Sequence, residues 1–187
     1  MKIGVFVGSF NPVHEGHMKM VNYILNKDIV DKIYVIPTLP YWDKDNFAPL
    51  EDRINMLKFY ENDRIIVDGD HNKYPYTYLL MEALVKEYPK DEFMLIIGAD
   101  NIVSFDKWKN YKDLLKHKII VTNRDDIDVY EYINKYEEKD NFIVLNDFPY
   151  IPISSTEIKK NIENNNNLNP DVYKYIKDHH LYEEESE

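Results

Sequence analysis

Short apolar runs alternate with longer amphipathic stretches along the chain. Most of the runs are apolar at consecutive positions, which is typical of strands in a parallel sheet that is covered on both faces. Six runs predict strands, at Ile3–Val7, Lys32–Ile36, Ile65–Val67, Phe93–Ile97, Lys118–Val121 and Phe142–Leu145.

Helical patterns lie between these predicted strands. They cover Gly16–Asn26, Leu50–Glu61, Tyr76–Glu87, Trp108–Leu115 and Tyr130–Glu138. Alternation of strand and helix at this spacing predicts an α/β fold, a Rossmann-like doubly wound parallel sheet with helices on both faces.

Two further helices form a predicted C-terminal helical segment. One follows Ile153–Thr156, where Ser155 or Thr156 can cap the first turn. The other starts at Asn169–Asp171, where the proline and the aspartate favour a first helical turn. The polar stretch Asn164–Asn169 links the two helices.

Length and charge limit the classes of function. At 187 residues and 22.5 kDa the chain can bury one core, so we expect one domain at 1–182 and an acidic tail at 183–187. Acidic residues outnumber basic ones by 34 to 23, for a net charge of −11. This excess argues against nucleic-acid or membrane partners, which need a basic surface.

The absence of cysteine excludes disulfides, thiolate metal sites and a cysteine nucleophile.

The N-terminus does not resemble a targeting segment. The strand at Met1–Val7 leads directly into a glycine turn, without the apolar core of a secretory signal. No window holds the ~18 consecutive apolar residues of a membrane span. We therefore expect a cytoplasmic protein.

The stretch Gly8–His17 carries the strongest chemical signal. Ligands of a doubly wound sheet collect beyond the carboxyl ends of its strands, and Gly8 lets the backbone approach a phosphate there. A helix starting near Gly16 would offer unpaired amides and a positive dipole end to the same anion. His14 and His17, three apart, can share one face and donate hydrogen bonds to phosphate oxygens. The glycines and proline at fixed offsets argue against two ordinary surface histidines.

A second stretch, Ile153–Lys159, offers a similar chemistry. Ser154, Ser155 and Thr156 place hydroxyl groups and amides at a helix N-terminus, which is an anion site. Lys159, one turn later, adds a positive charge suited to pyrophosphate. A plain helix cap is the alternative, but together with the first stretch the pattern favours a phosphate site.

Both stretches resemble signatures of the nucleotidyltransferase superfamily. Residues 8–17 read G-S-F-N-P-V-H-E-G-H and resemble G-x-F-D/N-P-x-H-x-G-H. Residues 153–159 read I-S-S-T-E-I-K and resemble I-S-S-T-x-I-R/K. The superfamily contains adenylyl- and cytidylyltransferases, so these motifs indicate a reaction class and leave the substrate open.

The middle of the chain resembles one family within this superfamily, the nicotinate-nucleotide adenylyltransferases. Residues 96–100 read I-I-G-A-D and are followed by Trp108, as in that family. Residues 75–77, P-Y-T, resemble its S-Y-T segment, and residues 40–44, P-Y-W-D-K, stand in the place of its P-P-H-K loop. The C-terminal stretch 171–182 is similar as well.

The resemblance implies an enzyme that joins ATP and nicotinate mononucleotide, with Mg²⁺ brought in by the ATP. It implies an ATP-binding set made of Gly8, Ser9, Phe10, His14, His17, Gly98, Asp100, Arg124, Ser154, Ser155, Thr156 and Lys159. Within this set His14, His17 and Lys159 would be catalytic and Asp100 would reach the ribose hydroxyls. Arg124 is nearly as well explained as a surface residue.

The resemblance also implies a place for the second substrate. Lys44 would meet the phosphate of the mononucleotide, Trp108 would stack on the pyridine ring, and Tyr76 and Thr77 with nearby amides would face the nicotinate carboxylate. Trp108 has a simpler alternative as a packing aromatic. The oligomeric state stays open, with a homo-oligomer as one option.

The chain departs from the family pattern at three places. Asn11 replaces an aspartate, Lys159 replaces an arginine and loses its bidentate geometry, and Trp42 with Asp43 stands where Pro-His is common.

Three rival functions stand beside this reading. They are pantetheine-phosphate adenylyltransferase, nicotinamide-mononucleotide adenylyltransferase and, from another class, a nucleotide-binding module without catalysis.

Overall fold

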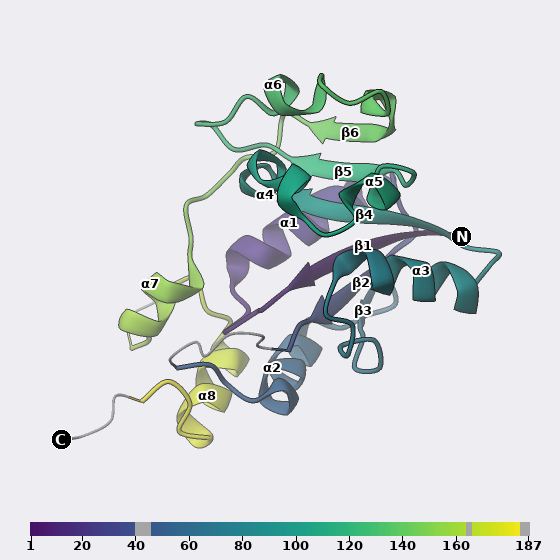
Figure 1. Ribbon diagram of the computed structural model, residues 1–187. Helices are drawn as coiled ribbons and strands as arrows, with labels where there is room; N and C mark the ends of the chain where they lie inside the picture. Colours follow the sequence, from purple (N-terminus) through teal and green to yellow (C-terminus); the bar gives the residue numbers. More distant parts are fainter. Residues whose placement is uncertain (40–45, 164–165, 184–187) are drawn as a thin grey trace.

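One parallel sheet forms the centre of the molecule. The computed structural model describes residues 1–39, 46–163 and 166–183. The sheet has the strand order β3-β2-β1-β4-β5-β6, with every neighbouring pair parallel (Figure 1). The strands are β1 Lys2–Gly8, β2 Lys32–Pro37, β3 Ile65–Val67, β4 Glu92–Gly98, β5 Ile119–Thr122 and β6 Phe142–Leu145. The predicted strands are confirmed, since their ends differ by at most one residue.

Helices cover both faces of the sheet, as predicted. They are α1 Glu15–Asn26, α2 Leu50–Leu57, α3 Thr77–Glu87, α4 Ala99–Val103, α5 Tyr111–Leu114, α6 Val129–Ile133, α7 Ser155–Lys160 and α8 Pro170–Asp178. Three short 3-10 helices lie between these elements, and they are η1 Lys58–Tyr60, η2 Phe105–Lys107 and η3 Lys139–Asn141. Helices α1, α2, α7 and α8 share one buried core with strand residues such as Phe6, and α3 to α6 share the other with residues such as Val5. The alternation of strand side chains between two cores explains why the strand sequences are apolar throughout.

Three predicted helices differ from the structure. The stretch Trp108–Leu115 is helical only as α5, because Trp108 is extended and Asn110 takes a left-handed conformation that asparagine tolerates. The stretch 130–138 shortens to α6, and 50–61 divides into α2 and η1. Helix α4 was not expected, because its five residues are too few to show a helical period.

The strand order places a binding crevice at a defined point. The chain moves from β1 outward to β2 and β3, then returns to β4 on the other side of β1. Ligands bind at such a switch point, beyond the carboxyl ends of the two strands that flank it. These strands are β1, which ends at Gly8, and β4, which ends at Gly98. In Figure 1 the arrowheads of β1, β5 and β6 point toward the side on which α7 lies. The two predicted phosphate motifs therefore meet at the same edge of the sheet.

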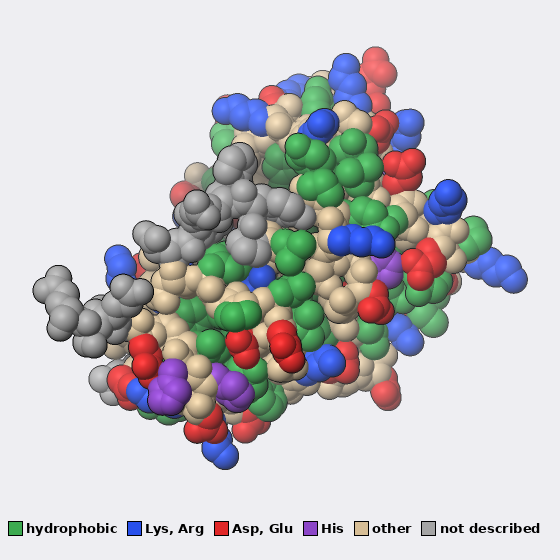
Figure 2. Space-filling model, turned by 60° about the horizontal axis from the view of Figure 1, so that its bottom comes forward, with side chains coloured by type: hydrophobic (Ala, Val, Ile, Leu, Met, Phe, Trp, Pro, Cys, Tyr) green, Lys and Arg blue, Asp and Glu red, His purple; other side chains and the backbone are tan. Residues whose placement is uncertain are grey.

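The surface carries mixed charge. On the face drawn in Figure 2, Lys and Arg side chains are interspersed with Asp and Glu over the part that is coloured. Within the described ranges, no helix is both long and apolar enough to cross a membrane.

Two predicted segments lie outside the described residues. They are the motif at residues 40–44, including Lys44, and most of the acidic tail.

Candidate active site

A cleft of about 590 Å³ opens at the switch point of the sheet. Its volume falls in the usual range for small-molecule sites. The ends of β1, β4 and β5 and the segment 148–154 surround it. Of the residues predicted for ATP, the cleft is lined by Gly8, Ser9, Phe10, His14, His17, Gly98, Asp100, Arg124 and Ser154.

His14 and His17 stand together at the start of α1. Their rings are stacked, with centroids 3.7 Å apart and an interplanar angle of 21°. Nδ1 of His14 accepts a hydrogen bond from the Gly16 amide at 3.0 Å, and Nδ1 of His17 accepts one from the His14 amide at 3.1 Å. The prediction that the two histidines share one face is confirmed. Gly16 is required beside them, since a Cβ there would lie 2.9 Å from the His14 ring.

These hydrogen bonds determine which nitrogen carries the proton in each neutral ring. Because Nδ1 is the acceptor in each ring, the proton of the neutral imidazole is on Nε2. Burial lowers the pKa of His14 to about 4. Burial, with a smaller contribution from His14, also lowers the pKa of His17 well below its usual value. Near pH 7 the cleft therefore has two neutral rings, each with one Nε2–H donor left for a ligand.

The backbone amides at the start of α1 are already paired. The Glu15 amide donates to the Asn167 carbonyl at 2.9 Å, the Gly16 amide to the His14 ring, and the His17 amide to the His14 carbonyl at 3.1 Å. The expectation of unpaired amides at this helix is therefore wrong, because the His14 side chain caps it. The Nε2–H groups and the helix dipole remain to attract an anion.

Phe10 and Asn11 hold the turn after β1. Phe10 adopts a left-handed conformation with φ of 45°, and its buried ring lies edge-on to His17 at 4.9 Å between centroids. The buried Oδ1 of Asn11 accepts hydrogen bonds from the Ala48 amide at 3.0 Å and the Tyr182 hydroxyl at 2.5 Å. Asparagine thus holds this turn in the place of the aspartate that the family pattern has.

A buried arginine ties together the loops after β1 and β2. Arg53 of α2 is fully buried, and its Nη1 donates to the carbonyls of Ser9 at 2.8 Å and Thr38 at 2.7 Å. Its Nε donates to the Ala48 carbonyl at 2.9 Å. The guanidinium therefore sets the spacing of two loops at the mouth of the site. No motif in the sequence marks this residue.

A hydrogen bond joins the second predicted motif to the opening motif. Ser155 Oγ donates to the Pro12 carbonyl at 3.1 Å, which ties α7 to the turn before His14. The cap of α7 is Ser154, whose Oγ accepts from the Glu157 amide, so the prediction of Ser155 or Thr156 as cap is wrong. Thr156 is exposed, and the Lys159 ammonium lies 5.9 Å from the Tyr182 ring centroid. Of this motif only Ser154 and Glu157, with Ile153 before them, line the cleft, and the phosphate roles of the others stay predictions.

Gly98 and Asp100 line the cleft at the end of β4. Gly98 precedes α4, and the exposed Asp100 side chain folds back over it. A Cβ on Gly98 would lie 2.7 Å from Asp100 Oδ1. The glycine therefore leaves the space that this carboxylate occupies.

We expect Gly98→Ala to weaken ATP binding with little loss of stability. The new methyl group would displace only the end of an exposed, flexible side chain, and the Gly98 backbone angles suit alanine. If Asp100 holds the ribose, its displacement should raise the KM for ATP by about 10-fold, the size of one lost hydrogen bond to a charged group. Steady-state kinetics with Gly98→Ala and Asp100→Asn test this. An unchanged KM in both variants would contradict the role of Asp100.

Arg124 lines the cleft beyond β5. Its Nε donates to Asp126 Oδ1 at 2.8 Å, and its guanidinium lies 5.1 Å from the Tyr150 ring centroid. Arg124 and Tyr150 together form one rim of the cleft. A flat cation beside an aromatic ring is suited to stack on a base, and the ATP-binding role of Arg124 stays a prediction.

A second, smaller pocket adjoins the cleft on the other side of β1. It has a volume of about 50 Å³, Val7 lines both spaces, and Tyr76 and Thr77 at the start of α3 line the small one. No side chain caps α3. The pocket thus has room for one small group, such as a carboxylate, next to a helix N-terminus.

Trp108 lies near this pocket without lining it. Its ring packs on Phe105 with centroids 5.4 Å apart, at the edge of a buried aromatic cluster. The neighbouring Lys109 ammonium lies 4.7 Å from the centroid of the Tyr76 ring, so residues 108–109 are close to the start of α3. The packing role considered for Trp108 is observed, and its stacking on a pyridine ring stays a prediction.

A family model described as "Cytidylyltransferase-like" matches residues 5–161. A relative from Fusobacterium nucleatum subsp. nucleatum, named "Probable nicotinate-nucleotide adenylyltransferase", is 37% identical over 95% of each chain. A relative of the same name from Flavobacterium psychrophilum is 34% identical over 97% of this chain and 99% of its own.

The chain belongs to the nicotinate-nucleotide adenylyltransferase family. Among solved structures, it is similar to "Plasmodium falciparum nicotinic acid mononucleotide adenylyltransferase complexed with NaAD", with a TM-score of 0.81 and 22% identity over 97% of both chains. This likeness confirms the predicted fold, and the family confirms that the chain is a nucleotidyltransferase.

The cleft and the small pocket are also lined by residues that the sequence did not predict. Thr122 and Asn123 line the cleft at the end of β5, and Phe148 and Tyr150 line it from the following loop. Position at the carboxyl end of a strand was the signal available for Thr122 and Asn123. His71 and Asn72, which line the small pocket, follow the short β3 and had no signal in the sequence.

Nucleotidyltransferases of this kind use a divalent metal with ATP. Among the described residues, no three His, Asp or Glu side chains form a group that could hold a metal ion. The acidic side chains that line the cleft are Asp100 and Glu157. This donor set suits a metal ion that arrives on the nucleotide phosphates with few protein ligands, as Mg²⁺ commonly does.

Proposed function

We propose that the protein transfers the adenylyl group of ATP to the 5′-phosphate of nicotinate mononucleotide. An oxygen of the mononucleotide phosphate attacks the α-phosphorus of ATP. The bond between the α-phosphorus and the bridging oxygen of the β-phosphate breaks, so nicotinate adenine dinucleotide and pyrophosphate form. The attacking phosphate is already an anion, and no general base is needed.

The observation that carries this proposal is the stacked histidine pair at the end of β1. Two Nε2–H donors, fixed by hydrogen bonds to Nδ1, line a cleft large enough for a nucleotide. Charge builds on the leaving pyrophosphate in the transition state. Donors held in place before the reaction stabilise that charge without reorganisation, which is the main catalytic contribution at such sites.

Several predicted residues would complete the phosphate site. We assign Lys159, Ser155 and Thr156 to the pyrophosphate side and Gly8, Ser9 and Phe10 to the turn that admits the phosphates. This assignment rests on the motif and on the Ser155–Pro12 hydrogen bond that joins the two motifs. Lys44, beyond the described residues, keeps its predicted role at the mononucleotide phosphate.

The choice of nicotinate over nicotinamide rests on the small pocket. The first amides of α3 have no side-chain cap, and a carboxylate accepts hydrogen bonds from such amides and gains from the helix dipole. A carboxamide would turn one of its own N–H donors toward them. The names of the relatives, nicotinate-nucleotide adenylyltransferase, support the same choice.

We propose Mg²⁺ as the metal, carried in by ATP. When bound, it would neutralise charge on the phosphate oxygens. Asp100 is the cleft carboxylate best placed beside the adenosine side, and Glu157 lies at the α7 side. A cytoplasmic location, the absence of nucleic-acid and membrane partners and a homo-oligomer stay predictions from the sequence.

The experiment that tests the proposed function is a substrate panel. Pyrophosphate release is measured with ATP and, separately, nicotinate mononucleotide, nicotinamide mononucleotide and phosphopantetheine. We expect kcat/KM to be at least about 10-fold higher for nicotinate than for nicotinamide mononucleotide, as for loss of one charge-assisted hydrogen bond. Preference for nicotinamide mononucleotide or phosphopantetheine would identify a rival enzyme. ATP binding without pyrophosphate release from any of them would identify a binding module.

A further inference from the structure

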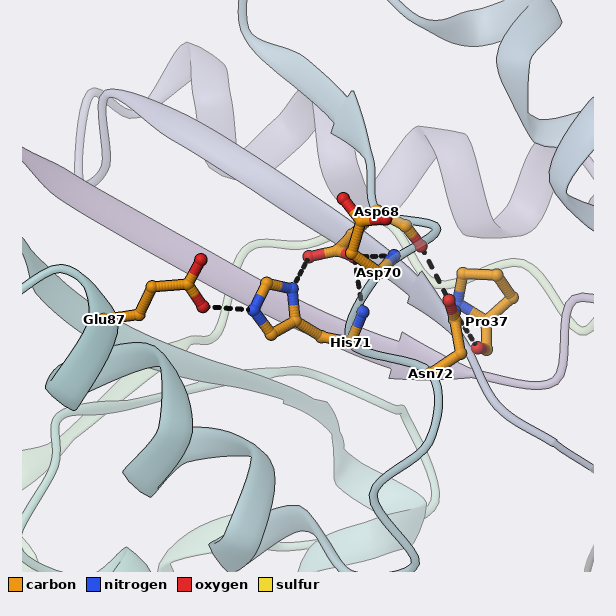
Figure 3. Close-up of polar contacts among 6 residues, drawn as sticks. All are labelled: Pro37, Asp68, Asp70, His71, Asn72 and Glu87. Carbon is orange, nitrogen blue, oxygen red and sulfur yellow. Dashed lines mark hydrogen bonds and ion pairs between the residues drawn. The ribbon is translucent and has the colours of Figure 1, made fainter.

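A histidine bridges two carboxylates behind the small pocket (Figure 3). Nδ1 of His71 lies 2.6 Å from Asp68 Oδ2, and its Nε2 lies 2.7 Å from Glu87 Oε2. Asp68 directly follows β3, and Glu87 is the last residue of α3. One ring thus joins the start of the loop 68–76 to the far end of the helix that this loop enters.

The same loop is tied to the sheet by the next residue. Asn72 is buried, and its Nδ2 donates to the Pro37 carbonyl at the end of β2, at 2.6 Å, and to the Asp68 carbonyl at 3.2 Å. Asp68 Oδ1 accepts from the amides of Asp70 at 2.7 Å and His71 at 2.9 Å. Figure 3 shows these contacts converging on one short stretch of chain.

The loop held in this way leads into the wall of the small pocket. His71, Asn72, Tyr74 and Tyr76 line the pocket together with Thr77, the first residue of α3. Tyr76 follows His71 by five residues, and both side chains line the same pocket, so a movement of the loop at His71 would shift Tyr76 and Thr77. The shape of the pocket therefore depends on the contacts of His71 and Asn72.

His71 can satisfy both carboxylates only as an imidazolium, because a neutral ring has a single N–H donor. Its side chain is only 10% exposed, and that burial lowers the pKa of His71. Hydrogen bonds and charge from Glu87 and Asp68 outweigh the burial, so the net pKa is raised above its usual value. The charged form of His71 is the one that fits this geometry.

We propose that His71 is a positioning residue for the second substrate, which it serves by holding the loop 68–76 and the start of α3 in the shape that receives the pyridine carboxylate. The proposal rests on the proposed function for the identity of that substrate. His71 itself does not need to touch the substrate, because it acts through Tyr76 and Thr77. The ATP side of the cleft shares Val7 with the small pocket but contains none of the His71 contacts.

The proposal predicts a pH dependence with a defined sign. The raised pKa means that the bridge is complete at pH values where both carboxylates are ionised and His71 is protonated, and that it is lost as the pH rises through the folded-state pKa of His71. Other ionisable groups around the ring are Asp70, Lys73 and Tyr74 on the loop, Tyr88 after α3 and Tyr34 on β2. Affinity for the mononucleotide should therefore fall on the alkaline side, while affinity for ATP stays constant.

The first test separates the two substrates kinetically. We expect His71→Gln to raise the KM for the mononucleotide by about 10-fold, the effect of one lost charge-assisted contact, and the KM for ATP by less than about 2-fold. His71→Arg keeps charge and several donors at every pH, so it should restore the KM and remove its pH dependence. His180→Gln is the matched control, because that exposed ring contacts one carboxylate, Glu183, at 2.8 Å.

A second test does not depend on the identity of the substrate. Nitrogen NMR of the His71 ring should show that both nitrogens stay protonated at pH values above about 6.5, the usual pKa of histidine. Hydrogen exchange of residues 68–77, corrected for intrinsic rates, should speed up over the same pH range in the wild type and not in His71→Arg. A neutral His71 at pH 6.5, or equal changes in both KM values in His71→Gln, would overturn the proposal. If the NMR and exchange results hold but no pyridine mononucleotide reacts, the proposed substrate is wrong and the positioning of the loop stands.

Discussion

His17→Ala is expected to lower kcat by about 100-fold or more, the scale for removing one preorganised donor at a charged transition state. His17 lines the cleft from which pyrophosphate would leave, burial keeps its ring neutral, and the hydrogen bond to its Nδ1 places the proton on Nε2. Water that enters the vacated space reorganises as charge develops, so it replaces the donor poorly. The KM for ATP should change much less than kcat, because the donor matters most in the transition state.

Two further variants isolate the donor from the fold. His17→Gln carries an amide N–H near the position of Nε2, and it should recover part of the lost kcat. His179→Ala removes a ring that stacks on Tyr175 of α8 at 3.8 Å between centroids, outside the cleft, and should leave kcat unchanged. Near-normal turnover in a folded His17→Ala protein would show that this histidine is not central to the reaction.

Arg53→Met is expected to destabilise the protein by about 3 kcal/mol or more. The three carbonyls of Ser9, Thr38 and Ala48 would lose a charged donor in a place that water does not reach, at a cost of about 1–3 kcal/mol for each unsatisfied group. The costs do not add fully, because the loops can relax together. Urea denaturation followed by circular dichroism measures the free energy of unfolding.

Arg64→Met is the matched control for this prediction. Arg64 also donates to three carbonyls, those of Asp31, Leu25 and Val30, but its side chain is 42% exposed. Water can replace its hydrogen bonds, so we expect a loss below about 1 kcal/mol. Equal losses in both variants would contradict the importance of burial at Arg53. Surviving Arg53→Met protein should also show weaker activity, because the loops after β1 and β2 would no longer be held together.

The sheet could be predicted from the sequence because its strands are buried on both faces. Runs such as Phe93–Ile97 have no alternation to confuse with an amphipathic helix. Helix α4 escaped prediction because its five residues are too few to show a helical period, and the break at Trp108–Asn110 depends on a left-handed residue that propensity does not register. Local pattern therefore predicted the elements buried in the sheet better than the short helices around it.

The site was predictable where its residues lie close together in the sequence. His14 and His17 share one motif, and the strand end at Gly98 locates Asp100. The capping role of His14, and with it the loss of free amides at α1, depends on side-chain orientation that residue types do not specify. Arg53 acts through contacts 5 to 44 residues away and His71 through contacts 3 to 16 residues away, so their roles emerge only when the chain is folded.

The most direct measurement follows the α-phosphorus of ATP. ATP labelled at that atom is incubated with the protein and nicotinate mononucleotide, and the products are separated. Adenylyl transfer predicts that the label appears in the dinucleotide, in an amount equal to the unlabelled pyrophosphate released, and that no transfer occurs without the mononucleotide. Label that remains in ATP, or that appears as AMP whether or not the mononucleotide is present, would contradict the proposed reaction.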